Sequence, residues 1–439
     1  MLQLPLDFLE EMKMILGKDC DLYEQCMEKE AFRGIAVNRL KADKEQILSE
    51  LPFVAEPVPF YEAGYYIPCD EKGVGNMPLH LGGAFYVQEP SAMSAVTLLD
   101  VQQGEKVLDL CAAPGGKSAQ IASCLNGTGL IWSNEVVRNR AQILLSNFER
   151  MGIAKGVVSS CYPEVLCKRL EGYFDKVLVD APCSGEGMFR KNPEAVKEWS
   201  REHVLSCAER QLSILRSAAG ALKKGGVLVY STCTFSYEEN EGVIQKFLSE
   251  NEDFEMCEIG EHFGRKTVLP CAVRITPIEG GEGHFAAKLR KKGESVSDAY
   301  SKPVKNDVPK ALSEIFEQVP QGVYTTAGEK LYIMPENLPD IKGLGVIRAG
   351  VLAGEFKKNR FEPAHALFMS AKPEHIRRVL ELDDKTVKEF LSGMEIESDG
   401  DNGYTAVTCH HIVIGFGKTS NGRLKNKYPK GLRILSAEK

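Results

Sequence analysis

Two short segments each place a cysteine directly after an apolar stretch. They read DAPCSGEG at residues 180–187 and STCT at residues 231–234. If the apolar stretches are parallel strands, both cysteines lie at the carboxyl edge of one sheet, where open α/β proteins bind ligands. A buried cysteine is usually an inert small hydrophobe. Here Pro182 and Gly185 fix a turn, and the small polar neighbours fill a core poorly, so the pair Cys183 and Cys233 indicates chemistry.

Paired thiols suit the methylation of cytosine at carbon 5, which is a weak nucleophile. A thiolate that attacks carbon 6 forms a covalent adduct, whose electron-rich carbon 5 takes a methyl group from a sulfonium donor. Loss of the carbon 5 proton and of the thiol restores the ring, so one hard step is split into easier ones. The attacking thiol must be deprotonated, and Asp180 could hold or protonate the ring nitrogen.

A glycine-rich segment, DLCAAPGGKS at residues 109–118, joins the first expected strand to the first expected helix. Its glycines let the backbone approach a ligand, and the helix start offers free N–H groups. The Rossmann pattern GxGxxG is absent. The Walker A pattern fits Gly116 to Ser118, but its first glycine would fall on Cys111, and Pro114 removes one N–H donor. A nucleoside triphosphatase is therefore the less favoured alternative.

Glu135 follows the second expected strand, 19 residues after Gly116. That is the place and spacing of an acid that accepts hydrogen bonds from ribose hydroxyls. The same acid could instead only stabilise the start of a helix. Together, the loop and the acid favour a ligand that carries a ribose.

The elements that must position these residues alternate strictly. Apolar strands are expected at 106–110, 130–133, 156–159, 175–179 and 227–231, and amphipathic helices at 116–125, 138–151, 164–170, 200–222 and 238–248. Strand followed by helix, five times over, predicts an α/β fold with a doubly wound, mainly parallel sheet.

The chain divides into four parts on composition. Residues 1–75 form a small domain with a helical start and extended pieces at 34–40 and 60–67. Residues 76–292 hold the α/β repeat, and residues 293–320 form a polar linker. Residues 321–439, rich in glycine and proline, suggest a compact mixed domain with helices near 374–382 and 384–391.

Composition narrows the function classes. The 439 residues carry a net charge of −7, yet residues 418–433 hold six bases and no acid, which hints at an anionic partner for that end. The 13 cysteines form no CxxC pair, so zinc knuckles and a disulfide scaffold fit poorly, and we expect reduced thiols in the cytoplasm. No apolar run approaches the roughly 18 residues of a membrane span.

The motifs together resemble the Sun family of RNA 5-methylcytosine methyltransferases and, within it, the bacterial enzymes that act on 16S ribosomal RNA. Three motifs are highly specific: CAAPGGK at 111–117, DAPCSGEG and STCT. The stretches at 86–93, 33–38 and 425–433 fit as well. The resemblance implies a Rossmann-like class I methyltransferase domain between a small N-terminal α+β domain and a C-terminal PUA-like α+β RNA-binding domain.

The resemblance also implies roles for single residues. Cys233 would be the nucleophile, Cys183 the thiol that helps resolve the adduct, and Asp180 a group beside both methionine and base. S-adenosyl-L-methionine would contact Asp180 and a set of residues from the loop and the second helix: Cys111, Ala112, Ala113, Pro114, Gly115, Gly116, Lys117, Glu135 and Arg140. One departure matters, because the acid that the family carries after the third strand is absent near Cys161.

A base inside a helix cannot reach two thiols, so the target must be single-stranded or flipped out. Candidate phosphate contacts are basic residues; those singled out are Arg190, Lys191, Lys288 to Lys292, Lys357, Lys358, Arg360 and the basic tail. Phe189, Phe356, Phe361 and Tyr428 could stack on bases, although a core role is favoured for the phenylalanines. His410 and His411 lack the spacing of a zinc site.

We therefore expect an enzyme that methylates cytosine carbon 5 in 16S ribosomal RNA or the small subunit. It should be a monomer with no metal ion and no membrane contact. Two alternatives stay open: a transfer-RNA cytosine-5 methyltransferase, and an RNA-binding ribosome assembly factor with weak or lost methylation. The second is motivated by the missing acid near Cys161.

Overall fold

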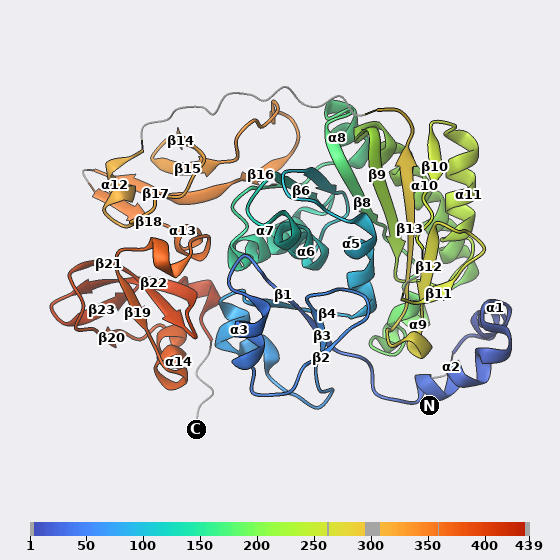
Figure 1. The fold of residues 1–439 in the computed structure, drawn as a ribbon, viewed down its shortest axis with the longest axis horizontal. Helices are drawn as coiled ribbons and strands as arrows, with labels where there is room; N and C mark the ends of the chain where they lie inside the picture. Colours follow the sequence, from blue (N-terminus) through green and yellow to red (C-terminus); the bar gives the residue numbers. More distant parts are fainter. Residues whose placement is uncertain (1–3, 261–262, 295–307, 359, 435–439) are drawn as a thin grey trace.

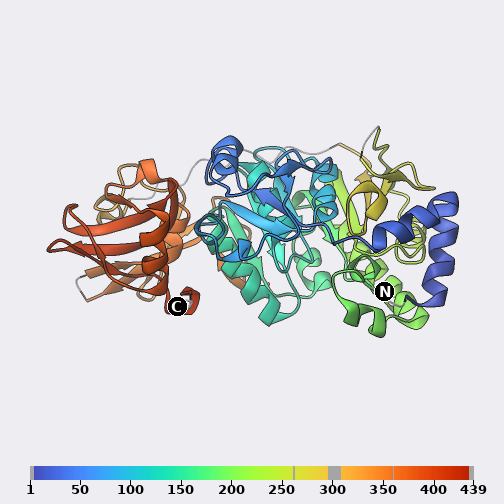
Figure 2. The ribbon, with the colours of Figure 1, turned by 90° about the horizontal axis from the view of Figure 1, so that it is seen from below.

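The computed structural model describes residues 4–260, 263–294, 308–358 and 360–434. The molecule is long in one direction (Figure 2). The N-terminal helices lie at one end, the C-terminal sheets at the other, and the large sheet lies between them (Figure 1). Among the described residues, no helix is long and apolar enough to cross a membrane.

The large sheet contains the five predicted parallel strands in the order β9-β8-β5-β6-β7. Its strand interiors are buried, as parallel strands covered by helices on both faces must be. The fold class expected from the sequence is confirmed. The strands are β5 (Lys106–Asp109), β6 (Leu130–Asn134), β7 (Gly156–Ser159), β8 (Phe174–Asp180) and β9 (Leu222–Thr232).

Helices connect these strands and cover both faces of the sheet. Each starts within three residues of its predicted position, and for most of them a glycine, a proline or a polar residue marks the start in the sequence. Ser200, for example, accepts a hydrogen bond from the N–H of His203 and caps the longest helix. The helices are α6 (Gly116–Leu125), α7 (Arg138–Met151), α8 (Pro163–Arg169), α10 (Arg201–Ala221) and α11 (Glu241–Glu250).

Antiparallel strands extend the sheet at both edges. Beyond β9 lie β13 (His284–Lys291), β12 (Ala272–Ile275) and β11 (Arg265–Lys266), and β10 (Phe254–Met256) pairs with β13. At the other edge, β16 (Val346–Ala349) pairs with β7. This last strand was not expected, because its residues belong to the region assigned to the C-terminal domain.

The N-terminal region forms a four-stranded antiparallel sheet in the order β2-β3-β1-β4. The extended pieces predicted around residues 34–40 and 60–67 are present in β1 (Gly34–Val37) and β3 (Gly64–Tyr66), beside the short β2 (Glu56–Pro57). The fourth strand, β4 (Phe85–Gln88), completes this sheet. The sheet therefore continues past residue 75, where the sequence suggested a boundary.

The C-terminal region holds two sheets that share one hydrophobic core. One has the order β14-β15-β17-β18 and the other β19-β21-β22-β23-β20. The strands of the first are β14 (Val323–Ala327), β15 (Lys330–Met334), β17 (Val351–Lys357) and β18 (Arg360–Pro363). Those of the second are β19 (Val379–Glu381), β20 (Ile396–Glu397), β21 (Gly403–Cys409), β22 (Ile412–Ser420) and β23 (Arg423–Asn426).

One predicted helix of this region is present and the other is not. α14 (Asp384–Ser392) forms where expected and is capped by Asp383, which accepts from the N–H of Thr386. The helix predicted near 374–382 is wrong. Val379–Glu381 instead pairs in parallel with β21, because the open edge of that strand offers backbone partners that a local periodicity does not reveal.

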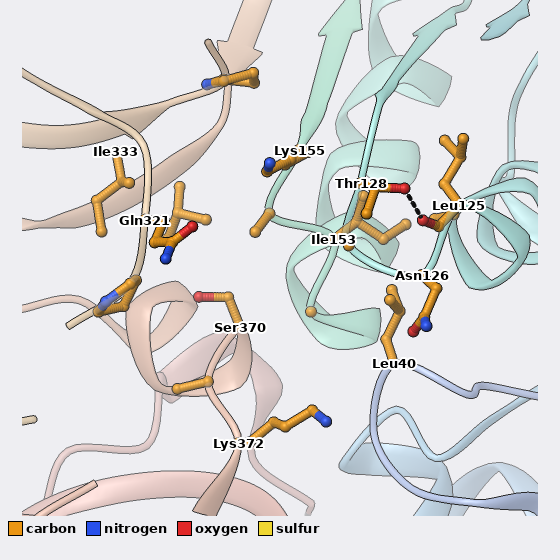
Figure 3. Close-up of a pocket in the computed structure, with 18 of the residues that line it drawn as sticks. Leu40, Leu125, Asn126, Thr128, Ile153, Lys155, Gln321, Ile333, Ser370 and Lys372 are labelled. Carbon is orange, nitrogen blue, oxygen red and sulfur yellow. Dashed lines mark hydrogen bonds between the residues drawn. The ribbon is translucent and has the colours of Figure 1, made fainter. Parts of the chain in front are cut away.

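A hollow of about 430 Å³ separates the C-terminal region from the loops at the amino edge of the large sheet. Ile153 and Thr128 line it on one side, and Ile333, Gln321 and Ser370 on the other (Figure 3). It lies at the edge opposite the two cysteines, so it is separate from the candidate site described below.

The N-terminal helices α1 (Leu6–Leu16) and α2 (Cys20–Met27) pack on Phe189 and Phe235, and one buried arginine adds hydrogen bonds at the end of α2. The Arg190 guanidinium donates to both carboxylate oxygens of Glu282, at 2.7 and 2.8 Å, and to the carbonyl of Cys26 at 2.6 Å. Only 8% of its side chain and 1% of that of Glu282 are exposed. Arg190 is thus a structural residue, and the prediction that it contacts RNA phosphates is wrong.

Replacing Arg190 should therefore loosen these helices. Arg190→Ala leaves the Glu282 carboxylate buried without its partner, which costs about 3–5 kcal/mol. Hydrogen exchange of the α2 amides should accelerate accordingly. Lys197→Ala removes an exposed pair with Glu194, worth less than about 1 kcal/mol, and should leave that exchange unchanged. Equal protection of α2 in both variants would contradict this role.

Candidate active site

The two predicted cysteines lie side by side. β8 and β9 are parallel neighbours in which Asp180 is paired with Ser231, and the N–H of Ala181 donates to the carbonyl of Ser231 at 2.8 Å. Both loops therefore leave the sheet at the same height. The Sγ atoms of Cys183 and Cys233 are 3.3 Å apart and share a hydrogen bond. That hydrogen bond and burial raise the pKa of Cys183 well above its ordinary value.

Asp180 sits at the base of the cysteine pair. Its carboxylate accepts from the Lys117 ammonium at 2.8 Å and from the Ser231 hydroxyl at 2.8 Å. Burial alone would raise the pKa of Asp180, but the neighbouring Lys117 charge holds it below its ordinary value. The carboxylate therefore stays ionised and can accept a hydrogen bond from a ring N–H or an exocyclic amine.

Two side chains of α7 hold the backbone of the loop 111–117 in place. Arg140 donates to the carbonyl of Ala113 at 2.9 Å, and Asn147 donates to the carbonyl of Pro114 at 2.8 Å. Gly115 has φ +116° and a Cβ there would meet Leu144 at 3.0 Å, so another residue would be strained. Beneath the loop, burial raises the pKa of Asp109 to about 7.

A cavity of about 540 Å³ joins the loop to the cysteines. Glu135 forms part of its wall, where its carboxylate accepts from the N–H of Val137 at 2.9 Å and pairs with Arg140 at 3.1 Å. Each carboxylate oxygen keeps a lone pair for a further donor. The structure thus brings together the loop, Glu135, Asp180 and both cysteines. The cavity residues from the predicted set are Cys111, Ala113, Glu135, Arg140, Asp180, Cys183 and Cys233.

The cavity wall near Cys161 has no acid at the position expected after the third strand, but the acid Glu164 lines the cavity slightly further along the chain. Tyr162, Pro163 and Glu164 line the cavity there. The turn that presents them is held by Asn134, whose side chain accepts from the N–H of Cys161 at 3.1 Å and donates to its carbonyl at 2.9 Å. Sequence reasoning missed Asn134, although its place at the end of β6 beside Glu135 was a usable signal.

Comparison with known families now identifies the chain. The model described as 16S rRNA methyltransferase RsmB/F matches residues 96–290, and that of the N-terminal domain of 16S rRNA methyltransferase RsmF matches residues 4–90. The RsmF first C-terminal domain matches residues 312–370, and the RsmF PUA domain residues 377–434. The chain is 32% identical to the ribosomal RNA small subunit methyltransferase F of Vibrio atlanticus, over 98% of this chain and 97% of that protein.

The chain belongs to the RsmF family of 16S rRNA methyltransferases. The protein of the same name from Aeromonas salmonicida is also 32% identical, over 91% of this chain and 90% of its own length. Among solved structures, a methyltransferase homolog protein from Pyrococcus horikoshii is 29% identical with a TM-score of 0.59, covering 66% of this chain and 96% of its own. The NSun6 structure from the same organism, solved with SFG, shares the fold at 22% identity and a TM-score of 0.59, covering 66% and 99%.

Family membership makes this protein a methyltransferase that uses S-adenosylmethionine. The cavity fits that cofactor in size and in chemistry. A carboxylate with spare acceptor capacity, Glu135, suits ribose hydroxyls, and the exposed apolar side chains of Val136 and Val137 offer a face for the adenine. The ionised Asp180 lies in the same wall and suits a positively charged group.

Several residues at the site were not predicted. Glu186 and Glu239 are both buried and accept hydrogen bonds from the backbone of the cysteine loops. Gln211, on α10, donates a hydrogen bond to Glu239. Both glutamates lie within a few residues of a cysteine, which is the signal that the sequence offered; Gln211 offers none. His284 is buried near Lys117 and Asp180, and burial lowers its pKa to about 3, so it is neutral.

The candidate RNA contacts divide into two groups. Phe189 and Tyr428 are buried, while Lys357 and Arg360 are exposed and both pair with Glu362. The C-terminal basic segment, residues 418–433, contains no acid, and most of its bases are exposed: Lys418, Arg423, Lys425, Lys427 and Lys430. That segment is therefore the better candidate for phosphate contacts.

His410 bridges two regions. Its ring nitrogens lie 2.7 Å from Glu50 and 3.0 Å from Asp384. Asp384, Cys409 and His410 form a group whose donor atoms are close enough for a metal ion. Both carboxylate contacts already satisfy the imidazole, so the arrangement is complete as a polar contact between the N-terminal and C-terminal regions.

Removing the Glu135 carboxylate should weaken cofactor binding selectively. A hydrogen bond to a charged group contributes about 1.5–3 kcal/mol, so Glu135→Ala should raise the Kd for S-adenosylmethionine roughly 10- to 100-fold in calorimetry. Glu149→Ala, on α7 and paired with Arg348 outside the cavity, should bind as the native protein does. Unchanged affinity in Glu135→Ala would show that the ribose lies elsewhere.

Proposed function

We propose that this enzyme methylates carbon 5 of a cytosine in 16S ribosomal RNA through a covalent bond to Cys233. One observation carries the proposal: two thiols from neighbouring strand ends lie 3.3 Å apart at the mouth of a cofactor-sized cavity. A single thiol would suffice for a simple nucleophile. A second thiol in contact with the first suits a reaction in which the first must be released again.

In this mechanism, the Cys233 thiolate attacks carbon 6 of the cytosine, and Asp180 accepts a hydrogen bond from the ring edge. S-adenosylmethionine, when bound, supplies the methyl group that carbon 5 takes. The adduct then loses the carbon 5 proton, the sulfur–carbon 6 bond breaks, and its electrons return to the Cys233 sulfur.

We assign the last proton transfer to Cys183. It takes the carbon 5 proton while its own proton passes to the leaving Cys233 sulfur, 3.3 Å away. The raised pKa of Cys183 supports this role, because a protonated thiol can donate to the departing thiolate. The balance closes: the positive charge of the methyl donor and the negative charge of the first thiolate disappear together, and both cysteines end as thiols.

The proposal that ribosomal RNA is the substrate rests on the C-terminal region. Its match to the RsmF PUA domain and its exposed bases support an RNA-binding role for that region, at the far end of the molecule from the N-terminal helices. We propose that residues 4–90, 96–290, 312–370 and 377–434 are the domains of the enzyme, as the four matched segments suggest. That it acts as a monomer without a metal ion stays a prediction.

Cys233 should be essential for methylation in cells. A strain that lacks the gene should regain 5-methylcytosine in 16S ribosomal RNA with the native gene or Cys257→Ala, and not with Cys233→Ala, in bisulfite sequencing. Cys257 is partly exposed and lies away from the cofactor cavity. A methyl group lost from transfer RNA instead would reassign the substrate, and full methylation by Cys233→Ala would remove the assigned nucleophile.

Cys183→Ala should form the adduct but release it slowly. Because the leaving sulfur then lacks its proton donor, a band of protein covalently joined to RNA should build up on a denaturing gel during turnover with undermethylated 16S ribosomal RNA. The double variant Cys183→Ala/Cys233→Ala should give no such band. If Cys183→Ala turns over at the native rate without a band, Cys183 takes no part in release.

A further inference from the structure

Two buried glutamates tie the cysteine loops to each other. Glu186, three residues after Cys183, accepts from the N–H groups of Phe235 and Ser236 on the second loop, at 2.8 and 3.0 Å. Glu239, on that second loop, accepts in turn from the N–H of Ser184 at 3.0 Å. Each loop thus supplies one carboxylate to the backbone of the other.

The contacts of Glu239 and Gln211 hold the residues on both sides of Cys183. Gln211 donates to Glu239 Oε2 at 2.7 Å and to the carbonyl of Pro182 at 3.0 Å. The residue before Cys183 is therefore held by Gln211, and the residue after it by Glu239. Both side chains are fully buried. The hydrogen bonds of Glu186, by contrast, involve no residue adjacent to Cys183.

Burying the two carboxylates costs solvation free energy. Burial raises the pKa of both Glu186 and Glu239, which means that each carboxylate lies where its charge is poorly solvated. Glu239 Oε1 has no hydrogen-bond partner among the described residues. An apolar side chain could fill the same space without this cost, so the acceptor function of Oε2 toward the Cys183 turn is what the glutamate adds.

We propose that Glu239 and Gln211 are positioning residues that hold the Cys183 thiol against the Cys233 sulfur, and that they govern release of the RNA adduct rather than its formation. The inference rests on the covalent route proposed above. Its geometric basis is that Glu239 and Gln211 hold the backbone of both neighbours of Cys183, whereas on the Cys233 side Glu239 contacts only the side chain of Thr234.

The test separates the two steps in single-turnover reactions with undermethylated 16S ribosomal RNA. Adduct formation and decay are followed on denaturing gels for Glu239→Ala, Glu239→Gln and Gln211→Leu. Glu239→Ala should slow decay roughly 10- to 100-fold, as expected when Ser184 loses its hydrogen bond to a charged group, and change formation less than about 2-fold. Gln211→Leu should slow decay in the same sense.

Glu239→Gln should restore near-native decay. Its amide oxygen can replace Oε2, and its amide nitrogen then occupies the place of Oε1, which makes no hydrogen bond among the described residues. A merely structural role would not separate formation from decay. Glu238→Ala is the matched control, since this adjacent glutamate pairs with Arg201 and does not contact the Cys183 turn; it should behave as the native enzyme.

The outcomes are distinct. If Cys183→Ala accumulates adduct and Glu239→Ala does not, the positioning role is wrong while the covalent route stands. If neither Cys183→Ala nor any other variant yields an adduct while methylation proceeds, the covalent route itself fails. Should Glu239→Ala not fold, as judged by thermal melting, Gln211→Leu decides alone: native decay in that variant overturns the proposal.

Discussion

The contact between two sulfur atoms is the constraint on which the rest of the site depends. The Cys183 and Cys233 thiols approach to 3.3 Å only because β8 and β9 end at the same height, with Asp180 opposite Ser231. A shift of one residue in either strand would turn one cysteine to the other face of the sheet. Parallel pairing buried on both sides fixes that register, which explains why the two cysteine loops converge at the carboxyl edge of the large sheet.

The sequence predicts most of this framework for physical reasons that are local. Strand and helix alternate with clear periodicities, so the sheet and its carboxyl edge follow from patterns that are local in the sequence. The loop 111–117, Glu135 and the two cysteines lie directly at strand ends, and for that reason their convergence is predictable. The assignment of Cys233 as nucleophile came from family resemblance, since geometry treats the two thiols almost alike.

What the sequence does not predict depends on contacts between distant segments. Gln211 lies on a helix, one glutamine among several polar residues, and only the packed structure places it against Pro182 and Glu239. Arg190 follows the DAPCSGEG motif and resembles a phosphate contact, yet Glu282, 92 residues away, accepts it in a buried pair. β16 and β19 are likewise determined by open strand edges, which attract backbone from any segment within reach.

The distribution of charge explains how a chain of net negative charge can bind RNA. Many of its bases are occupied within the fold: Lys117 by Asp180, Arg190 by Glu282, Arg274 by Glu241. The exposed bases of β22, β23 and the following turn therefore concentrate positive charge at one end of a long molecule. Exposed cations attract RNA over roughly a Debye length of 8 Å at physiological salt. In the mechanism proposed above, binding of RNA at those bases leaves the cysteine edge of the sheet free to keep its own charges balanced, with the ionised Asp180 facing the cationic methyl donor rather than a phosphate.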